Sequence, residues 1–323
     1  MGLCVTCKCG ASILNSGHRC SPLFEVAAII VAVPTFNSLG VKNSIPLASV
    51  LNQGFFDALT NETDETKRWR PFPLMKNIED IRADATFFDF DDNSTEFVHE
   101  GSRQFKGLIA TTSGKGAVAP EMKRIIESVR CVETSVYIIT TGNQLAGKLS
   151  ADGLSLEPLQ IDEQSIYANF IKATNEQGQH IMLQFNFAAS EKDENLDMFD
   201  CSELGDADLL GLKGLLDISS EVISSSTTDI KIKLKSNFGT PLTPVIVQGL
   251  LVADFVSSDS GATSSLFNET TQLDVAITGF VESPNGTYEL TFAAQNSADV
   301  IVIKPLKDGF DFTEVEKNPV SIP

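Results

Sequence analysis

At residues 180–187 the sequence reads HIMLQFNF, and apolar and polar side chains alternate along most of it, with Met182 as the exception. A period of two is typical of a β-strand with one buried face and one solvated face. Shorter stretches of strand character lie earlier in the chain, at 105–111 and 136–139. The sequence therefore predicts a mainly β chain in which a sheet packs against a core.

The apolar run VAAIIVAV at 26–33 is predicted to be a strand buried on both faces. It is far shorter than the ~20 residues that a membrane-spanning helix needs, so no membrane association is expected. Lys8 and Arg19 precede it, as basic residues precede the apolar core of a signal peptide. Glu25 lies directly against the run, however, and no convincing cleavage site follows Pro34, which favours the strand.

Two Phe-containing segments, 86–90 and 95–98, flank the polar stretch 91–94 and predict a β-hairpin. The same region imitates the spacing of a calcium-binding loop, with Asp89, Asp91, Asn93, Thr95 and Glu100 at ligand positions. Ser94 stands where that loop requires glycine. We therefore interpret the segment as a hairpin.

One helix is predicted from Pro120 to about Val129, because proline suits the first helical position and Glu121 complements the helix dipole. Its apolar face has the spacing i, i+3, i+4, i+7 and is formed by Met122, Ile125, Ile126 and Val129. This helix should pack on the sheet.

The chain becomes rich in Ser and Thr after about residue 217, and short strands follow one another without a helix. These strands are expected at 228–234, 245–252, 272–278, 287–292 and 299–304. This pattern predicts an immunoglobulin-like β-sandwich, without the cysteine pair and core tryptophan of antibody domains, and with Tyr288 as a corner tyrosine. The predicted organisation is a leader (1–22), a β domain (23–205), a connector (206–217) and the sandwich (218–323).

The chain is acidic, with 43 Asp and Glu against 24 Lys and Arg, which gives a formal net charge of -19. Such a surface repels phosphate backbones, so we expect DNA contact only in transit. The 21 Phe against 3 Tyr and 1 Trp suggest that aromatic residues serve burial. Only three histidines occur, no GxSxG elbow is present, and the glycine-rich segment 113–116 is not a phosphate-binding loop. The protein is therefore predicted not to be an enzyme.

The leader contains five soft metal ligands, which are Cys4, Cys7, Cys9, His18 and Cys20. These could hold one structural zinc ion in a closed site, or Cys9 and Cys20 could form a disulfide. An unconstrained tail is the third possibility. No other cofactor is expected. Cys131 and Cys201 stand alone in the sequence and are interpreted as buried small hydrophobic residues.

The helix-flanked β domain, the acidic balance, the missing catalytic set and the C-terminal sandwich together resemble tail tube proteins of long-tailed bacteriophages. The segment Cys9-Gly-Ala-Ser-Ile-Leu-Asn-Ser-Gly-His-Arg-Cys20, which runs into the strand 26–33, is similar to the start of tube-like proteins from phages of Bacteroidota. The resemblance covers about the first 200 residues. It implies a tail-tube-like β-sandwich or barrel with a flanking helix and a long hairpin arm, six copies in a ring, and rings stacked around a channel. The leader and the long 35–85 segment depart from small tube proteins.

We therefore expect a virion structural protein, and specifically a tail tube subunit that forms stacked hexameric rings around an acidic DNA conduit. Its partners would be further copies of itself and other tail proteins, and its location the virion tail after assembly in the host cytoplasm. The alternative is a surface adhesion or carbohydrate-binding protein that uses the immunoglobulin-like domain. Glycosylation sequons at Asn61, Asn93, Asn268 and Asn285 would suit that alternative.

Overall fold

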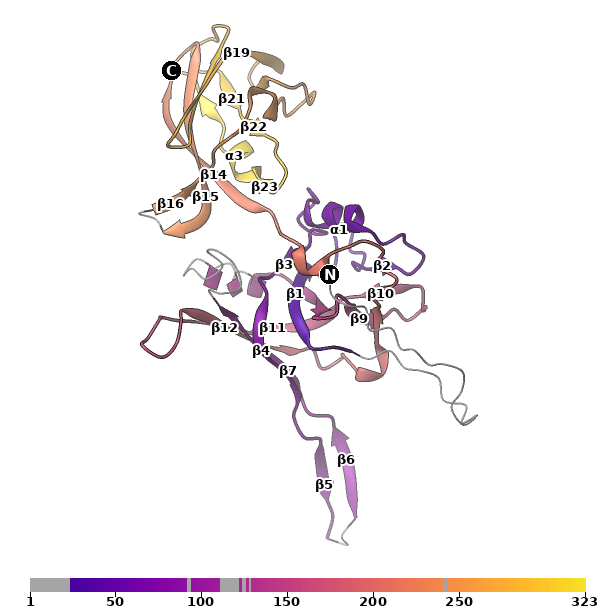
Figure 1. Cartoon of the computed structure of the whole chain (residues 1–323). Helices are drawn as coiled ribbons and strands as arrows, with labels where there is room; N and C mark the ends of the chain where they lie inside the picture. The colour runs from indigo at the N-terminus through magenta and orange to yellow at the C-terminus, as the bar shows by residue number, and fades with distance from the viewer. Residues whose placement is uncertain (1–23, 92–93, 111–121, 124–125, 128, 241–242) are drawn as a thin grey trace. The chain divides into compact units, whose positions relative to one another are not determined.

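The computed structural model describes residues 24–91, 94–110, 122–123, 126–127, 129–240 and 243–323. The chain divides into two compact units, Met1–Gly214 and Leu215–Pro323, which we call unit 1 and unit 2. Both are built mainly of strands, so the predicted mainly β fold is confirmed (Figure 1). Across the ranges given above, no helix is long and apolar enough to cross a membrane.

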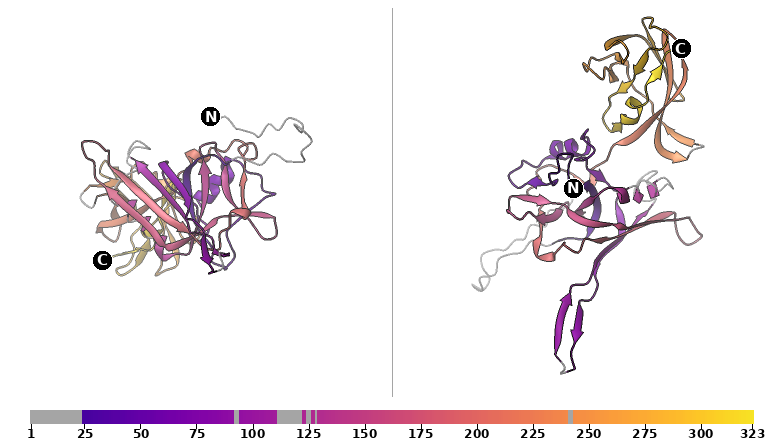
Figure 2. Two further views of the ribbon diagram at one scale, coloured as in Figure 1. Left: turned by 90° about the horizontal axis from the view of Figure 1, so that it is seen from below. Right: turned by 180° about the vertical axis from the view of Figure 1, so that it is seen from behind.

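Unit 1 contains one eleven-stranded sheet that curls into a half-barrel (Figure 2). The strand order along its main path is β2-β10-β9-β8-β11-β12-β7-β4, and β1, β3 and β13 pair beside it. The bounds are β1 Ala27–Pro34, β2 Ile45–Pro46, β3 Arg70–Pro71, β4 Met75–Arg82, β7 Arg103–Ala110, β8 Thr134–Thr140, β9 Leu145–Leu149, β10 Ser155–Glu157, β11 Leu159–Ile171, β12 His180–Phe187 and β13 Leu196–Phe199. The two ends of this path, β2 and β4, are sheet edges.

β1 and β8 form the centre of unit 1, which explains the uninterrupted apolar run at the start of the chain. They pair antiparallel over most of their length, and all seven residues of β8 are buried. One face of β1, with Ile29 and Val31, packs into a core that also contains Tyr137. Ala32, on the other face, lies with β11 and β12 side chains around an apolar hollow. Both faces of the strand are covered by protein, so period-two alternation is lost.

Helix α1, Gln53–Thr60, covers one side of this core. The Asn52 side chain caps it by accepting a hydrogen bond of 2.9 Å from the Phe55 backbone N–H. Phe56 is fully buried against Trp69, which in turn packs on Tyr137 with ring centroids 4.9 Å apart. Trp69 is the one tryptophan of the chain, so its fluorescence reports the folding of unit 1 alone.

The predicted helix at 120–129 is helical at 122–123 and 126–127, where the structure describes it, and a 3-10 turn follows at Val129–Cys131. Met122, Ile126 and Val129 are buried, as the apolar spacing predicts. Pro120, Glu121 and Ile125 lie outside the described residues.

The predicted connector 206–217 is not a connector over most of its length. Ala207, Leu209 and Leu212 are buried in the core of unit 1, and Leu209 is fully inaccessible. The Asn143 side chain holds this segment by donating to the Ala207 carbonyl and accepting from the Leu209 N–H, both at 2.8 Å. The boundary between the units falls at 214/215, so the expected domain end at 205 is about nine residues too early.

Unit 2 is a β-sandwich whose halves are joined through one long strand. The sheet order is β23-β14-β15-β20-β19-β18-β21-β24 with β16 beside β15, and β17 pairs with β22. β19 pairs with β20 over its second part and with β18 over its first. The bounds are β14 Leu216–Ser225, β15 Asp229–Thr240, β16 Thr243–Ile246, β17 Phe255–Val256, β18 Ser265–Asn268, β19 Leu273–Ser283, β20 Thr287–Phe292, β21 Val300–Val302, β22 Lys304–Pro305, β23 Phe310–Asp311, β24 Val320–Ser321 and the short helix α3 Thr313–Glu316.

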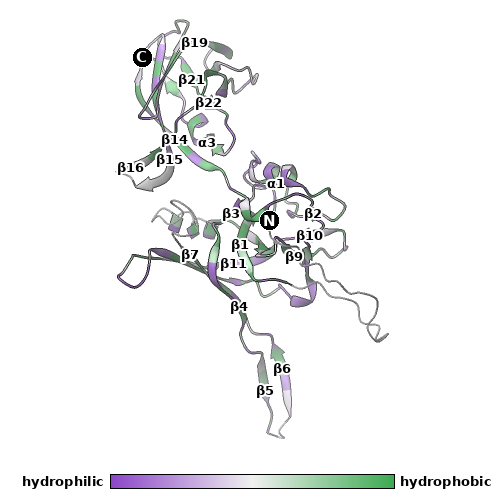
Figure 3. Cartoon of the chain, viewed as in Figure 1, coloured by the Kyte–Doolittle hydropathy of each residue, from purple (hydrophilic) through white to green (hydrophobic). Residues whose placement is uncertain are grey.

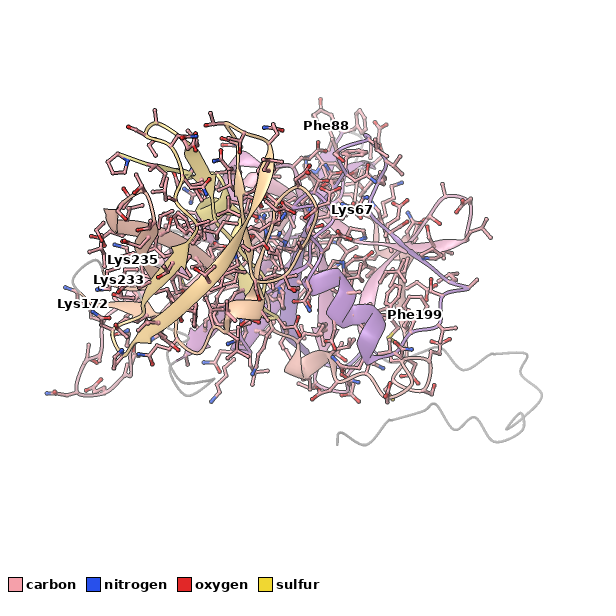
Figure 4. All side chains as sticks on the ribbon, turned by 90° about the horizontal axis from the view of Figure 1, so that it is seen from above. Lys67, Phe88, Lys172, Phe199, Lys233 and Lys235 are labelled. Atoms are coloured by element: carbon pink, nitrogen blue, oxygen red, sulfur yellow. The ribbon has the colours of Figure 1, made fainter. Side chains whose placement is uncertain are left out.

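β15 shows how alternation builds unit 2. Ile230, Ile232 and Leu234 are fully buried in its core. The lysines between them project outward, and Lys233 and Lys235 are seen on the surface in Figure 4. Lys231 pairs with Glu289 at 3.1 Å and Lys235 with Glu221 at 2.8 Å.

The predicted strand 245–252 ends early, at Ile246. Gly249 adopts a positive φ of 76°, which interrupts the extended backbone. Val247 and Leu250 are nevertheless buried on either side of it. Tyr288 ties this irregular stretch down, because its hydroxyl donates to the Val247 carbonyl at 3.1 Å from a fully buried ring. The bonded carbonyl lies 41 residues upstream, whereas a corner tyrosine binds backbone only a few residues upstream, so this bond is not the predicted corner link.

Replacing Tyr288 with phenylalanine should therefore destabilise unit 2 by about 1–2 kcal/mol, because the Val247 carbonyl is left without this donor. Burial raises the pKa of Tyr288 to about 12. The neutral phenol thus stabilises the fold fully below pH 10, and this contribution is lost as the pH rises from 10 to 12. In calorimetric unfolding of the full chain, the transition temperature of unit 2 should be lower in the variant than in the wild type. It should also fall less in the variant between pH 10 and pH 12. An unchanged Trp69 transition is the internal control, and an unchanged unit 2 transition would contradict the assignment.

Candidate functional site

A two-stranded ribbon projects from unit 1 between β4 and β7 (Figure 1). It consists of β5, Thr86–Asp89, and β6, Thr95–His99, and confirms the predicted hairpin. We call residues 84–100 the arm. Every residue of both strands is exposed, so the described residues of unit 1 do not cover the arm. A lone two-stranded ribbon is marginally stable in water.

Both faces of the arm carry phenylalanine. Phe87 pairs across the strands with Phe97, with ring centroids 5.9 Å apart, and Phe88 packs edge-on against Phe90 at 4.9 Å. The four residues are 44–58% exposed. Figure 3 shows apolar residues along β5 and β6. The expectation that phenylalanine serves burial is therefore wrong here. Exposed aromatic clusters of this kind mark contact surfaces.

The arm is also strongly acidic. Between residues 84 and 100 the sequence has six Asp and Glu and no Lys or Arg. A partner for this surface must therefore offer apolar area without acidic residues. Nucleic acid and anionic membrane surfaces do not meet that condition.

Ion pairs hold the base of the arm. Arg82 contacts Glu100 and Asp193, each at 2.9 Å, while Arg103 binds Asp80 at 2.5 Å and approaches Asp193 at 3.4 Å. The guanidinium of Arg103 also lies over a β12 aromatic ring, at 4.6 Å from its centroid. Burial alone would lower the pKa of Arg103, but the paired carboxylates raise it. Asp193 therefore joins both sides of the arm to the body of unit 1.

Gly101 lets the two backbone segments that enter and leave the arm approach each other at this base. Its backbone is buried, and a Cβ atom added there would overlap the carbonyl oxygen of Ala83 and lie 2.7 Å from that of Asp84. The neighbouring hydrogen bond, from the Ala83 N–H to the Ser102 carbonyl, measures 2.9 Å. Close backbone approach thus requires glycine at this position.

A second exposed apolar surface lies at the opposite edge of the same sheet. Residues 36–50, which we call the acid-free loop, run into and past edge strand β2 and contain no Asp or Glu and a single Lys. Leu39 and Val50 are each 80% exposed. The Leu47 N–H donates to the carbonyl of Leu154, whose side chain is 68% exposed, which extends this apolar surface onto the β9–β10 turn.

The face of β7 and β12 that points away from the core is polar but not acidic. Lys106 is its cation on β7, and it pairs with Glu79 at 3.4 Å. Three amide side chains, Gln104, Gln184 and Asn186, lie on this face among apolar residues and His180. The Gln104 side chain donates to Asn186 at 3.2 Å. The half-buried residues of this face are Gln104, Lys106, Leu108, Ala110, His180, Met182, Gln184 and Asn186.

The residues predicted to bind metal in the leader lie outside the described residues; they are Cys4, Cys7, Cys9, His18 and Cys20. The same holds for segment 113–116. Of the calcium-like spacing, Asn93 lies outside the described residues; among the described members, Asp89 faces Thr95 across the hairpin and Glu100 pairs with Arg82. Within the described part of the chain, no three His, Cys, Asp or Glu side chains gather as a metal site.

Two further expectations change. Cys201 is buried as predicted, but it is disulfide-bonded rather than a lone hydrophobic residue. Asn268 is completely buried and hydrogen-bonded to Asp299 at 3.0 Å, so a glycan cannot be attached there in the folded protein.

The arm's contact surface was not recognised from the sequence, although one signal was present. Phe87 and Phe88 are adjacent, so both faces of that strand are apolar, which a strand with one solvated face would not show. Comparison with protein-family models, with curated proteins and with solved structures finds no match for this chain.

Proposed function

We propose that this protein is a structural subunit that assembles with copies of itself, most specifically a virion tail tube subunit forming stacked hexameric rings. The exposed phenylalanine arm carries the proposal, because a monomer gains nothing from holding four aromatic rings in water. The ion pairs at Arg82 and Arg103 and the close approach at Gly101 keep this apolar ribbon extended. An extended arm is suited to reaching a neighbouring subunit.

The open edges of the sheet add support. β2 and β4 end the strand path of unit 1, and an unpaired edge is normally protected or used for association. A curled sheet with free ends is also the shape that copies can continue into a closed barrel. In this proposal the other partners are further tail proteins, and DNA is a passing cargo.

The channel wall in such an assembly would be the polar face of β7 and β12. An acidic wall was expected from the net charge, whereas this face carries three amide side chains and one compensated Lys106–Glu79 pair. We propose a nearly neutral wall in its place. DNA would slide along it because little counterion release accompanies contact with neutral amides.

Negative-stain microscopy and light scattering of the purified full chain test this function. At high protein concentration, and over a range of salt, we expect rings or tubes with a mass several times that of the 34.9 kDa chain. Their abundance should rise with salt, since like charges on a chain of net charge -19 repel each other less when screened. A protein that stays monomeric under all of these conditions would rule the proposal out.

A further inference from the structure

We infer that the arm of one copy binds the acid-free loop of the next copy, in a head-to-tail contact between opposite edges of unit 1. The inference rests on the proposed self-assembly and specifies the two surfaces that meet. The occupant of the loop is the arm of a second copy of this chain.

The arm and the acid-free loop both expose apolar side chains. The arm presents Phe87 and Phe97 on one face and Phe88 on the other, all more than half exposed. The loop presents Leu39 and Val50 at 80% exposure; Val41 and Leu47 are also exposed, as is Leu154, to whose carbonyl the Leu47 N–H donates. Aromatic side chains set into an aliphatic surface are the usual anchors of protein contacts.

The charges favour this pairing over other surfaces of the chain. The arm has six acidic residues, while the whole stretch 26–56 has none and contains Lys42. Lys42 pairs with Glu157 at 3.3 Å, and Ser38 contacts Asp64 at 3.4 Å, so this surface is not free of carboxylates. The loop itself adds no negative charge, and in a protein of net charge -19 it therefore repels an acidic arm less than an acidic segment would. An arm-to-arm contact would instead bring twelve acidic groups together, six from each copy.

The strand order places the arm and the loop at opposite ends of the sheet, so the same contact can be repeated from one copy to the next. The arm leaves the sheet between β4 and β7, at one end of the strand path, and the loop contains β2 at the other end. Each copy therefore offers one donor and one acceptor surface. Such a heterologous contact closes into a ring or continues as a filament.

Two variants of the full chain separate the surfaces. The arm variant combines Phe87→Ser with Phe97→Ser, and the loop variant combines Leu39→Asp with Val50→Asp. Leu273→Ser, on an exposed strand end of unit 2 at 64% exposure, is the matched control. Because all these side chains are exposed, unfolding followed by Trp69 fluorescence should be unchanged in each.

Light scattering then measures association. Each double variant alone should be monomeric, with self-association weakened about 100-fold or more, while the control assembles like the wild type. An equimolar mixture of the two double variants should form a heterodimer and nothing larger. The intact arm of the loop variant can bind the intact loop of the arm variant, and no second arm–loop contact remains.

The other possible results distinguish a failure of the arm–loop contact from a failure of the proposed function. If the wild type assembles and both double variants do so equally, the arm–loop contact is wrong while the proposed function stands. If the loop variant alone still associates, or the mixture stays monomeric, the arm binds another surface. If the wild type never assembles, the proposed function fails and the contact with it.

Discussion

Replacing Gly101 with alanine should cost unit 1 about 3 kcal/mol of stability, and it should open the base of the arm. The added Cβ would overlap the backbone carbonyl of Ala83, so no side-chain rotation can relieve the contact. The two backbone segments at the base of the arm must separate instead, which breaks the hydrogen bond between Ala83 and Ser102. The arm would then lose the fixed direction that assembly requires.

Urea unfolding followed by Trp69 fluorescence measures the stability, and hydrogen exchange at residues 83–102 locates the opening. Gly54→Ala is the control, since its new Cβ would meet only Asn52 Oδ1, at an ordinary 3.5 Å. Within helix α1 that change should stabilise slightly, by about 0.5–1 kcal/mol. Equal behaviour of the two variants would show that the close approach at Gly101 does not matter.

Ending the chain after residue 205 should abolish the folding of unit 1, whereas ending it after Gly214 should preserve it. The shorter product lacks Ala207, Leu209 and Leu212, all of which are buried in the core. Removing one buried leucine side chain alone costs about 2–5 kcal/mol. The loss of the whole segment is therefore comparable with the full stability of a domain, about 5–15 kcal/mol.

Soluble yield, Trp69 fluorescence and cooperative urea unfolding of the two products test this boundary. In the full chain, Leu209→Ala should reproduce part of the loss, while Leu210→Ala, at a half-buried neighbouring position, should cost much less. A folded 1–205 product would mean that the segment 206–214 is dispensable and that the sandwich begins where the composition changes.

Strands with one covered face were predictable because their residues record which face is buried. β12 occupies the same residues, His180–Phe187, as the alternating stretch of the sequence, and its odd-numbered side chains are the buried ones. The hairpin at 86–99 followed from a polar turn between two segments of strand character. Patterns of two to eight neighbouring residues suffice for such features.

The connector was misjudged for the opposite reason. Residues 204–216 contain glycines and acids among leucines, a local pattern typical of a linker. Leu209 packs in the core of unit 1, and Asn143, 66 positions earlier, binds the backbone of this segment. No local pattern carries the position of a hydrogen-bond partner so far away in the sequence.

By itself the sequence determined the β class, the buried central strand at 26–33, the hairpin, and the acidic net charge. Each of these depends on local periodicity or on total charge. Only the tertiary structure decided that Phe87, Phe88 and Phe97 are exposed and that the acid-free loop lies at the opposite sheet edge. A phenylalanine in a strand has the same local pattern whether or not another layer covers it. Burial depends on which distant segments pack together, and strand order sets that.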